Sequence, residues 1–194
     1  MTMRRAPHEP RGFTLIEVMV VVGLVGVLVA LAAPNLFRML RRGDLRSEAR
    51  LLYAAFVEAQ GLAINSGNRG GLRLVLSGDD RGWEVLVDRN GDGTLERDRR
   101  HRFADSRPGI GFGPATGFPQ AFAAPYAAVP HDAWCTPCGA GNTEGTITFD
   151  ADGLVVGGVS GSIVLQNTAG ELPNHVEALV FIGATGAVRL DRVE

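Results

Sequence analysis

The stretch with the most structural information is residues 11–33, RGFTLIEVMVVVGLVGVLVALAA, whose apolar part contains a single acidic residue, Glu17. The 21 residues from Phe13 to Ala33 would form a helix about 31 Å long, at a rise of about 1.5 Å per residue. That length matches the hydrocarbon core of a bilayer, so the sequence predicts a membrane-spanning helix. A carboxylate inside such a helix costs on the order of 2.5–3.5 kcal/mol. We therefore expect Glu17 to have a function, such as pairing with a positive group once the helix leaves lipid.

The residues around this helix distinguish it from an ordinary secretory signal. Such a signal has a basic region, roughly 7–15 apolar residues and then a cleavage site of small residues. Here the apolar run is longer, and Pro34 directly after Ala32-Ala33 disfavours cleavage at that point. Arginines flank the run on both sides, so the positive-inside rule does not fix its orientation. The flanking arginines are Arg4, Arg5 and Arg11 before the run and Arg38, Arg41, Arg42 and Arg46 after it.

The string Arg11-Gly12-Phe13-Thr14-Leu15-Ile16-Glu17-Val18 resembles the cleavage and N-methylation signature of type IV prepilins and type II secretion pseudopilins. The resemblance implies that residues 1–12 are a leader, that a prepilin peptidase cuts between Gly12 and Phe13, and that the new amine of Phe13 is methylated. It implies that Glu17 pairs with the amino terminus of a neighbouring subunit during assembly. It also implies an inner-membrane protein with a cytoplasmic N-terminus and a periplasmic globular domain, which later enters a pilus or pseudopilus fibre with other pilins.

We expect the helix of residues 13–34 to continue as an amphipathic helix over residues 35–67, with the kink that the resemblance implies at Pro34. After the proline, apolar positions recur at spacings of four and three residues, which places them on one helical face. We expect this face to pack on the chain's own sheet over residues 49–63, whereas residues 13–40 would pack against other subunits. Gly67 is a typical helix stop. The positions of the face are Leu45, Ala49, Leu52, Phe56, Ala59 and Ala63.

Residues 68–194 are expected to form a globular β-rich domain, because the 26 glycines and 10 prolines of the chain indicate many turns. A hairpin is predicted from strands at 72–76 and 83–87 around a turn at 77–82, with a shorter strand near 101–104. Residues 107–145 have no clear period and are expected to be a long irregular loop. Further strands are predicted at 146–149, 162–166, 177–182 and 187–190. Together with the resemblance, this order predicts the α+β pilin fold, a long N-terminal helix packed on a C-terminal antiparallel β-sheet domain.

Three segments of this domain resemble the minor-pilin branch called GspH/FimT: 82–88 (GWEVLVD), 146–153 (TITFDADG) and 184–190 (ATGAVRL). The resemblance implies a minor pilin or pseudopilin, which is a structural subunit of a type II secretion pseudopilus or a type IV pilus and not an enzyme. The loop 107–145 is longer than that branch leads us to expect. We predict that it contacts another minor subunit or a substrate.

Residues 88–96, DRNGDGTLE, have the oxygen ligands of a calcium loop at Asp88, Asn90, Asp92 and Glu96, with a glycine at the sixth position. The twelfth position is Arg99, where a calcium loop needs a bidentate glutamate. Asx residues and glycine are also the usual residues of a turn after a strand. A plain turn is therefore the favoured interpretation and weak calcium binding the alternative; no other cofactor is expected.

The segment Trp134-Cys135-Thr136-Pro137-Cys138 is similar to the redox site of thioredoxins. That chemistry needs a helix N-terminus to lower the thiol pKa, and the Gly139-Ala140-Gly141-Asn142 that follows is a poor helix start. We expect a structural disulfide between Cys135 and Cys138 in an oxidising compartment. A zinc site with His131 or His101 and a membrane-tethered thiol oxidoreductase are the alternatives.

A basic run covers Arg97, Arg99, Arg100, His101 and Arg102, and phosphate contact there would suggest a DNA-binding minor pilin at a pilus tip. A solvated charged loop is the favoured interpretation, because acidic residues lie between and beside the arginines. The net charge of −2 becomes −4 without the leader, which holds three Arg and one Glu, so bulk charge does not indicate nucleic acid. The neighbouring acids are Asp88, Asp92, Glu96 and Asp98.

Overall fold

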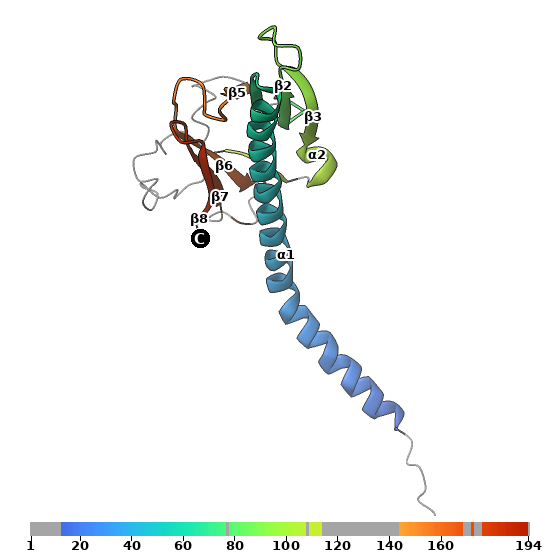
Figure 1. Cartoon of the computed structure of the whole chain (residues 1–194). Helices are drawn as coiled ribbons and strands as arrows, with labels where there is room; N and C mark the ends of the chain where they lie inside the picture. Colours follow the sequence, from blue (N-terminus) through green and yellow to red (C-terminus); the bar gives the residue numbers. More distant parts are fainter. Residues whose placement is uncertain are drawn as a thin grey trace, which may run out of the picture. The chain divides into compact units, whose positions relative to one another are not determined.

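The computed structural model describes residues 13–76, 78–107, 109–113, 144–168, 172 and 176–193. The chain divides into two units, Met1–Met39 and Leu40–Glu194, and each is described by itself. One helix, α1 (Leu15–Ser66, 52 residues), begins in the first unit and ends in the second (Figure 1).

Helix α1 begins directly after Thr14, which caps it. The Thr14 hydroxyl oxygen accepts a hydrogen bond from the backbone N–H of Glu17 at 3.3 Å, and the Thr14 carbonyl accepts one from Val18 at 3.2 Å. Thr followed three residues later by Glu is the capping-box pattern. The side chains of residues 13–32 are exposed, and the helix is long and apolar enough to cross a membrane. The predicted helix is confirmed, and Pro34 lies inside it, but the kink expected there stays a prediction.

In the second unit, the helix presents one face to the core. All six apolar positions predicted from the 4-3 spacing are buried, so the expectation that this face packs on the chain's own sheets is confirmed. The helix ends at Ser66, where Gly67 takes a φ of +67° and donates its N–H to the Ile64 carbonyl at 3.4 Å. Two further residues, Glu48 and Ala55, are buried on the same side of the helix.

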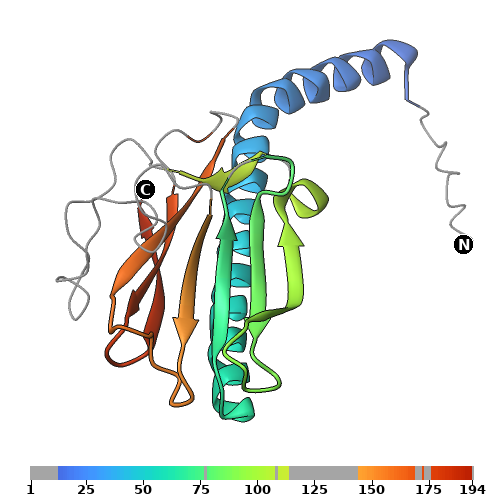
Figure 2. The same ribbon diagram turned by 90° about the horizontal axis from the view of Figure 1, so that it is seen from above.

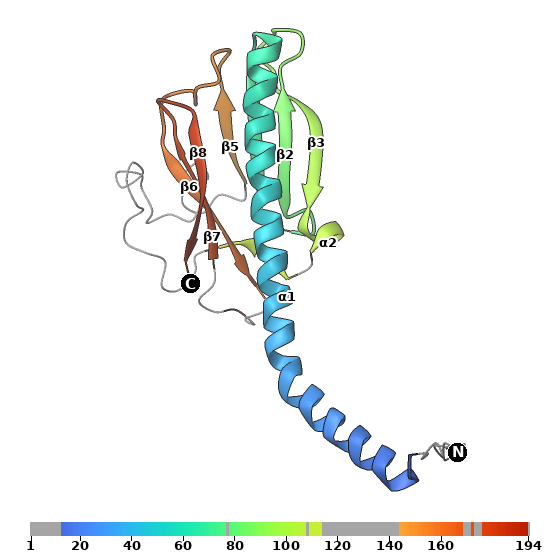
Figure 3. The ribbon, with the colours of Figure 1, turned by 60° about the horizontal axis from the view of Figure 1, so that its bottom comes forward.

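The strands form two antiparallel four-stranded sheets (Figure 1). The first has the order β3-β2-β1-β5, and the second has the order β4-β6-β7-β8. A short helix, α2 (Phe103–Ser106), follows β3. Figures 2 and 3 show β5 between the other strands of its sheet and the strands of the second sheet, alongside helix α1. The strands are β1 (Gly70–Val75), β2 (Gly82–Val87), β3 (Glu96–Arg102), β4 (Ile110–Phe112), β5 (Glu144–Phe149), β6 (Gly161–Asn167), β7 (Val176–Ile182) and β8 (Ala187–Val193).

A single core joins the helix to both sheets. The Phe56 ring of α1 lies 4.9 Å from the Phe149 ring of β5, edge to face, and 5.5 Å from the Phe181 ring of β7. All three side chains are almost completely buried. A long N-terminal helix with antiparallel sheets on its second half is the α+β layout that was predicted, and it fits the pilin fold.

The predicted hairpin is confirmed as β1 and β2, and the four later strands are confirmed as β5 to β8. The strand expected near 101–104 is placed wrongly, because β3 covers Glu96–Arg102 and residues 103–106 are helical. The charged loop expected over the basic run is therefore an edge strand. Strand β4 lies inside the segment 107–145, which was expected to be irregular throughout. The remainder of that segment, residues 114–143, lies outside the described residues, and so do Cys135, Cys138 and His131.

Candidate functional site

The N-terminal end of helix α1 holds the predicted processing and assembly residues. Phe13 is 82 % exposed, and Glu17 is exposed in the first helical turn. Among the described residues, the Glu17 carboxylate has no ion-pair partner. The hydrogen bond between Glu17 and Thr14 is made by the backbone N–H of Glu17 and not by its carboxylate. Negative charge in a first turn is favoured by the helix dipole, so the position is locally acceptable for an acid. Within the part of the chain that the structure describes, no cationic side chain neutralises the carboxylate.

Among the described residues of its own unit, nothing covers the apolar surface of residues 13–39. Its large side chains are more than half exposed, and the Cβ that an alanine would add at Gly23 or Gly26 would meet nothing within 4 Å. Monomeric soluble proteins rarely expose contiguous apolar surface of this kind. A surface of this kind fits membrane anchoring.

A buried polar cluster joins the globular part of α1 to β3 and α2. Glu48 is fully buried; its carboxylate lies 2.9 Å from the His101 Nε2 and accepts a hydrogen bond from the Ser106 hydroxyl. Trp83 stacks on the His101 ring at 4.1 Å, and the Arg107 guanidinium lies 3.7 Å from the carboxylate. Burial alone raises the pKa of Glu48, but the hydrogen bonds from His101 and Ser106 and the nearby positive charges hold that pKa below its ordinary value.

This cluster was missed by the sequence analysis, which considered His101 as a zinc ligand. In the structure the imidazole contacts Glu48 and Trp83. The described residues, which do not include Cys135 and Cys138, contain no group of three His, Cys, Asp or Glu that could hold a metal ion, so the zinc alternative stays untested. The signal that could have revealed it is the position of Glu48. It lies three residues after Leu45 and four before Leu52, on the predicted buried face, where an acid needs a partner.

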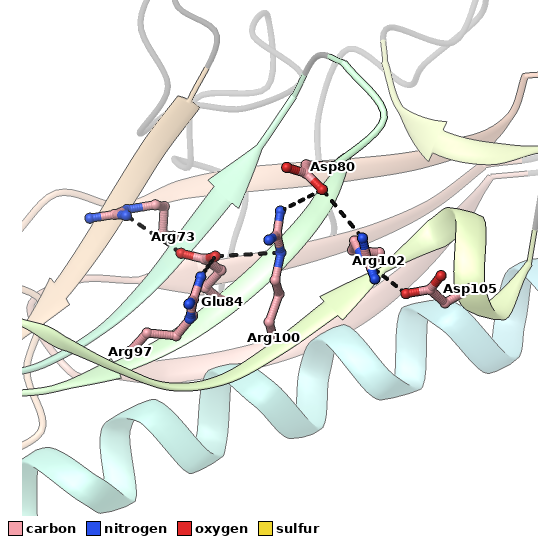
Figure 4. A network of polar contacts seen from close by, with 7 residues as sticks. All are labelled: Arg73, Asp80, Glu84, Arg97, Arg100, Arg102 and Asp105. Carbon is pink, nitrogen blue, oxygen red and sulfur yellow. Dashed lines mark hydrogen bonds and ion pairs between the residues drawn. The ribbon is translucent and has the colours of Figure 1, made fainter.

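The predicted basic run lies on β3, and its arginines are neutralised by carboxylates (Figure 4). Glu84 on β2 is nearly buried and lies within ion-pair distance of three guanidiniums: Arg97 at 3.1 Å, Arg73 at 3.4 Å and Arg100 at 3.5 Å. Asp80 lies 2.9 Å from Arg100, whose hydrogen bond is the main cause of the lowered pKa of that carboxyl.

The other two arginines of the basic run are paired as well. Arg102 bonds Asp105 at 2.7 Å, and Arg99 pairs with Glu58 of the helix. The arrangement is a structural ion-pair network across the sheet, and it leaves little free positive charge for a nucleic acid.

The predicted calcium loop uses its own oxygens to hold its turn. The two Asp88 carboxylate oxygens accept backbone N–H groups of Gly91 at 2.7 Å and Gly93 at 2.9 Å, and Asp88 is buried. The Asp92 carboxylate accepts the N–H of Thr94 at 2.7 Å, and this bond is the main cause of the lowered pKa of that carboxyl. Asn90 donates to Asp92, while Glu96 is exposed at the start of β3. These bonds are those of a self-capped turn.

Comparison with known proteins agrees with the N-terminal signature. Residues 10–33 match the family model described as the prokaryotic N-terminal methylation motif. The chain is 32 % identical over 96 residues to the type IV major pilin protein PilA of Myxococcus xanthus, which covers 41 % of this chain and 44 % of that protein. It is 48 % identical over 40 residues to the type II secretion system core protein G of Escherichia coli, which covers 21 % of this chain and 28 % of that protein.

The chain thus spans less than half the length of these two curated relatives. No solved structure shows a significant match. Three findings point to the same assignment. They are the methylation motif, the homology to one type IV pilin and one type II secretion protein, and the long N-terminal helix followed by antiparallel sheets. Together they support an assignment of the chain to the superfamily of type IV pilins and type II secretion pseudopilins.

Proposed function

We propose that this protein is a minor pilin or pseudopilin of the GspH/FimT branch, a structural subunit of a type II secretion pseudopilus or a type IV pilus. A prepilin peptidase removes residues 1–12, the amine of Phe13 is methylated, and the subunit assembles with other pilins through its N-terminal helix. Before assembly the helix anchors it in the inner membrane, with the globular part in the periplasm. The observation that carries the proposal is the exposed apolar helix, whose first turn holds the carboxylate of Glu17.

The branch assignment is supported by where the three resembling segments lie. Residues 82–87 are β2, the TITFDADG segment is β5 with its turn, and ATGAVRL covers a turn and part of β8. In the TITFDADG segment, the Asp150 carboxylate accepts hydrogen bonds from the backbone N–H groups of Asp152 at 3.1 Å and Leu154 at 2.9 Å, so it stabilises the turn after β5. The basic run gives no support to the DNA-binding alternative, because its arginines are paired.

The test has two measurements on one set of strains. Mass spectrometry of the membrane-extracted protein should show a chain that begins at a methylated Phe13. Glu17→Gln keeps the size and helix propensity of the side chain but removes its charge, and it should block entry into sheared fibres while leaving cleavage intact. The control is Glu58→Gln, which removes a charge from the globular part of the same helix and should assemble normally. Normal incorporation of Glu17→Gln, or cleavage near Ala33, would refute the proposal.

A further inference from the structure

Strand β5 (Glu144–Phe149) has an unpaired edge. It is the last strand of the first sheet and forms a ladder with β1, while the strands of the second sheet lie on its other side (Figure 3). The Thr148 carbonyl points to that other side, because it accepts a hydrogen bond from the Val156 N–H at 2.8 Å. Main-chain groups alternate in direction along an antiparallel strand, so the N–H and C=O of Thr146 point the same way. Among the described residues, these two groups of Thr146 have no hydrogen-bond partner.

The chain itself shows how a strand fits this edge. Val155 forms one antiparallel bridge with Phe149, and the chain then turns away from β5. The turn is closed by a hydrogen bond from the Gly158 N–H to the Val155 carbonyl at 2.8 Å, and Gly157 and Gly158 have φ values of +81° and +66°. The pairing therefore stops after one bridge. No described strand covers the rest of this side of β5, residues 144–147, which we call the open edge.

A groove lies beside the open edge. Its volume is about 370 Å³, which falls within the range of roughly 300–1,000 Å³ that is typical of ligand pockets. Apolar side chains outnumber polar ones in its lining, and two of them, Val156 and Val159, are 43 % and 49 % exposed. An apolar side chain that enters the groove would therefore bury apolar surface next to the main-chain groups of Thr146. The lining residues are Thr146, Ile147, Thr148, Val155, Val156, Val159 and Phe181.

The open edge lacks the charges that protect the opposite edge of the same sheet. Exposed edges pair readily with other chains, and charged side chains are a common means of preventing this. Strand β3 at the opposite edge is charged along its length (ERDRRHR), whereas β5 (EGTITF) has one charge, Glu144, followed by strand-forming residues. Glu144 is exposed and has no ion-pair partner among the described residues, so this end of the edge favours a cation.

We propose that the open edge binds an extended peptide segment of another protein, which joins the first sheet as an added strand. The segment runs antiparallel to β5, in the direction that Val155 and Val156 already take. Thr146 exchanges main-chain hydrogen bonds with it, an aliphatic side chain of the segment enters the groove beside Val156, and a basic residue lies near Glu144. The site belongs to the globular unit and is separate from assembly through the N-terminal helix.

The experiment measures peptide binding to the full chain in detergent by fluorescence anisotropy. The probe is a labelled peptide of about eight residues, in which valine and threonine alternate between two terminal lysines. A second peptide has the same sequence but carries N-methyl groups on its valines and threonines, so it lacks the main-chain donors. We expect saturable binding of the first peptide and binding of the second that is weaker by about tenfold or more, because main-chain hydrogen bonds are lost.

Two lysine substitutions at sites of similar exposure isolate the groove. Val156→Lys places a charge beside it and should weaken binding by about fivefold or more, whereas Val57→Lys, on helix α1 at a residue that is 42 % exposed, should change binding by less than about twofold. Glu144→Lys should reverse the charge preference at low salt, from the peptide that ends in lysines to one that ends in glutamates.

The two peptides are compared on the unaltered chain, so a variant that fails to fold cannot produce the expected difference between them. Equal binding of the two peptides, equal effects of the two valine substitutions, or no binding to the unaltered chain overturns the inference. Self-association of the unaltered chain that Val156→Lys abolishes, without peptide binding, overturns it as well, because the open edge would then bind a second copy of this chain.

Discussion

The imidazole Nε2 of His101 on β3 lies 2.9 Å from the carboxylate of Glu48, a fully buried side chain 53 positions earlier in the sequence. This contact joins the stem helix to the edge strand of the first sheet. It is reinforced by Ser106 and by Arg107, which also bonds Asp44 at 3.0 Å and Ser47 at 3.2 Å. The cluster is therefore a buried polar anchor between the helix and β3, in addition to the more exposed Arg99–Glu58 pair.

Glu48→Ala should destabilise the globular unit by about 3 kcal/mol, because it leaves buried donors without an acceptor. Glu48→Gln, which can still accept a hydrogen bond, should cost less. The measurement is urea unfolding of the detergent-solubilised chain, followed by near-ultraviolet circular dichroism. Glu58→Gln is the control and should change stability by less than about 1 kcal/mol, because Glu58 pairs with Arg99 at an exposed site. An Ala variant as stable as the control would show that the cluster contributes nothing.

The same carboxylate should give a pH dependence. The pKa of Glu48 is lower in the folded chain than its ordinary value of 4.5, so its ionised form stabilises the fold. That contribution is fully present above the unfolded pKa and is lost as the pH falls through the folded pKa. The stability difference between the unaltered chain and Glu48→Gln should therefore be constant from pH 7 to about 5 and shrink below 4.5. A difference that grows on acidification would contradict this assignment.

Periodicity was sufficient to predict the stem, because a helix repeat forces Leu45, Ala49, Leu52 and Phe56 onto one side. The hairpin β1–β2 was equally predictable, since both strands are apolar and a turn separates them. The N-terminal signature identified the superfamily because its residues are contiguous. These features are local, and each can be recognised within a window of about 20 residues.

The position of β3 could not be found in this way. Its sequence, ERDRRHR, has no apolar alternation, and its side chains are stabilised by residues far along the chain, such as Glu58 for Arg99. Strand β4 is only three residues long, with glycines before, within and after it, so propensity argues against a strand. Both strands exist because tertiary contacts outweigh local preference.

Glu84→Gln should convert the outer face of the first sheet into an anion-binding surface. It leaves Arg73, Arg97 and Arg100 around a neutral side chain, so the local charge rises by one while the positions of the guanidiniums stay defined. We expect the unaltered chain to show no retention on immobilised duplex DNA at physiological salt, and the variant to show weak retention that disappears as salt rises. Tight binding by the unaltered chain would instead favour the DNA-uptake alternative.

Removal of calcium should leave the stability of the loop at 88–96 unchanged. The Asp88 oxygens are occupied by the N–H groups of Gly91 and Gly93, so the turn is stabilised without a metal. The thermal midpoint should be the same in excess calcium and in excess chelator. Asp88→Ala should lower stability by about 1–2 kcal/mol under both conditions. A midpoint that rises with calcium in the unaltered chain but not in Asp88→Ala would show that the loop binds the ion.

Substitution by alanine should change the stability of the fold in opposite directions at two glycines, Gly70 on β1 and Gly61 on helix α1. Gly70 begins β1 where it passes close to helix α1, and a Cβ there would lie 2.3 Å from the Ala59 carbonyl oxygen and 3.0 Å from the Ala63 Cβ. Since both neighbours belong to a packed helix, they cannot move aside without disturbing the core. Gly70→Ala should therefore destabilise by about 1–3 kcal/mol.

Gly61→Ala is the matched control. Gly61 lies in helix α1, the helix that Gly70 approaches, and a Cβ at Gly61 would meet nothing within 4 Å. Alanine restricts the unfolded backbone and suits the helix, so the variant should be more stable by up to about 1 kcal/mol. Urea unfolding of both variants beside the unaltered chain gives the two signs in one experiment. Equal effects of the two substitutions would mean that the close approach of β1 to helix α1 at Gly70 does not constrain that position.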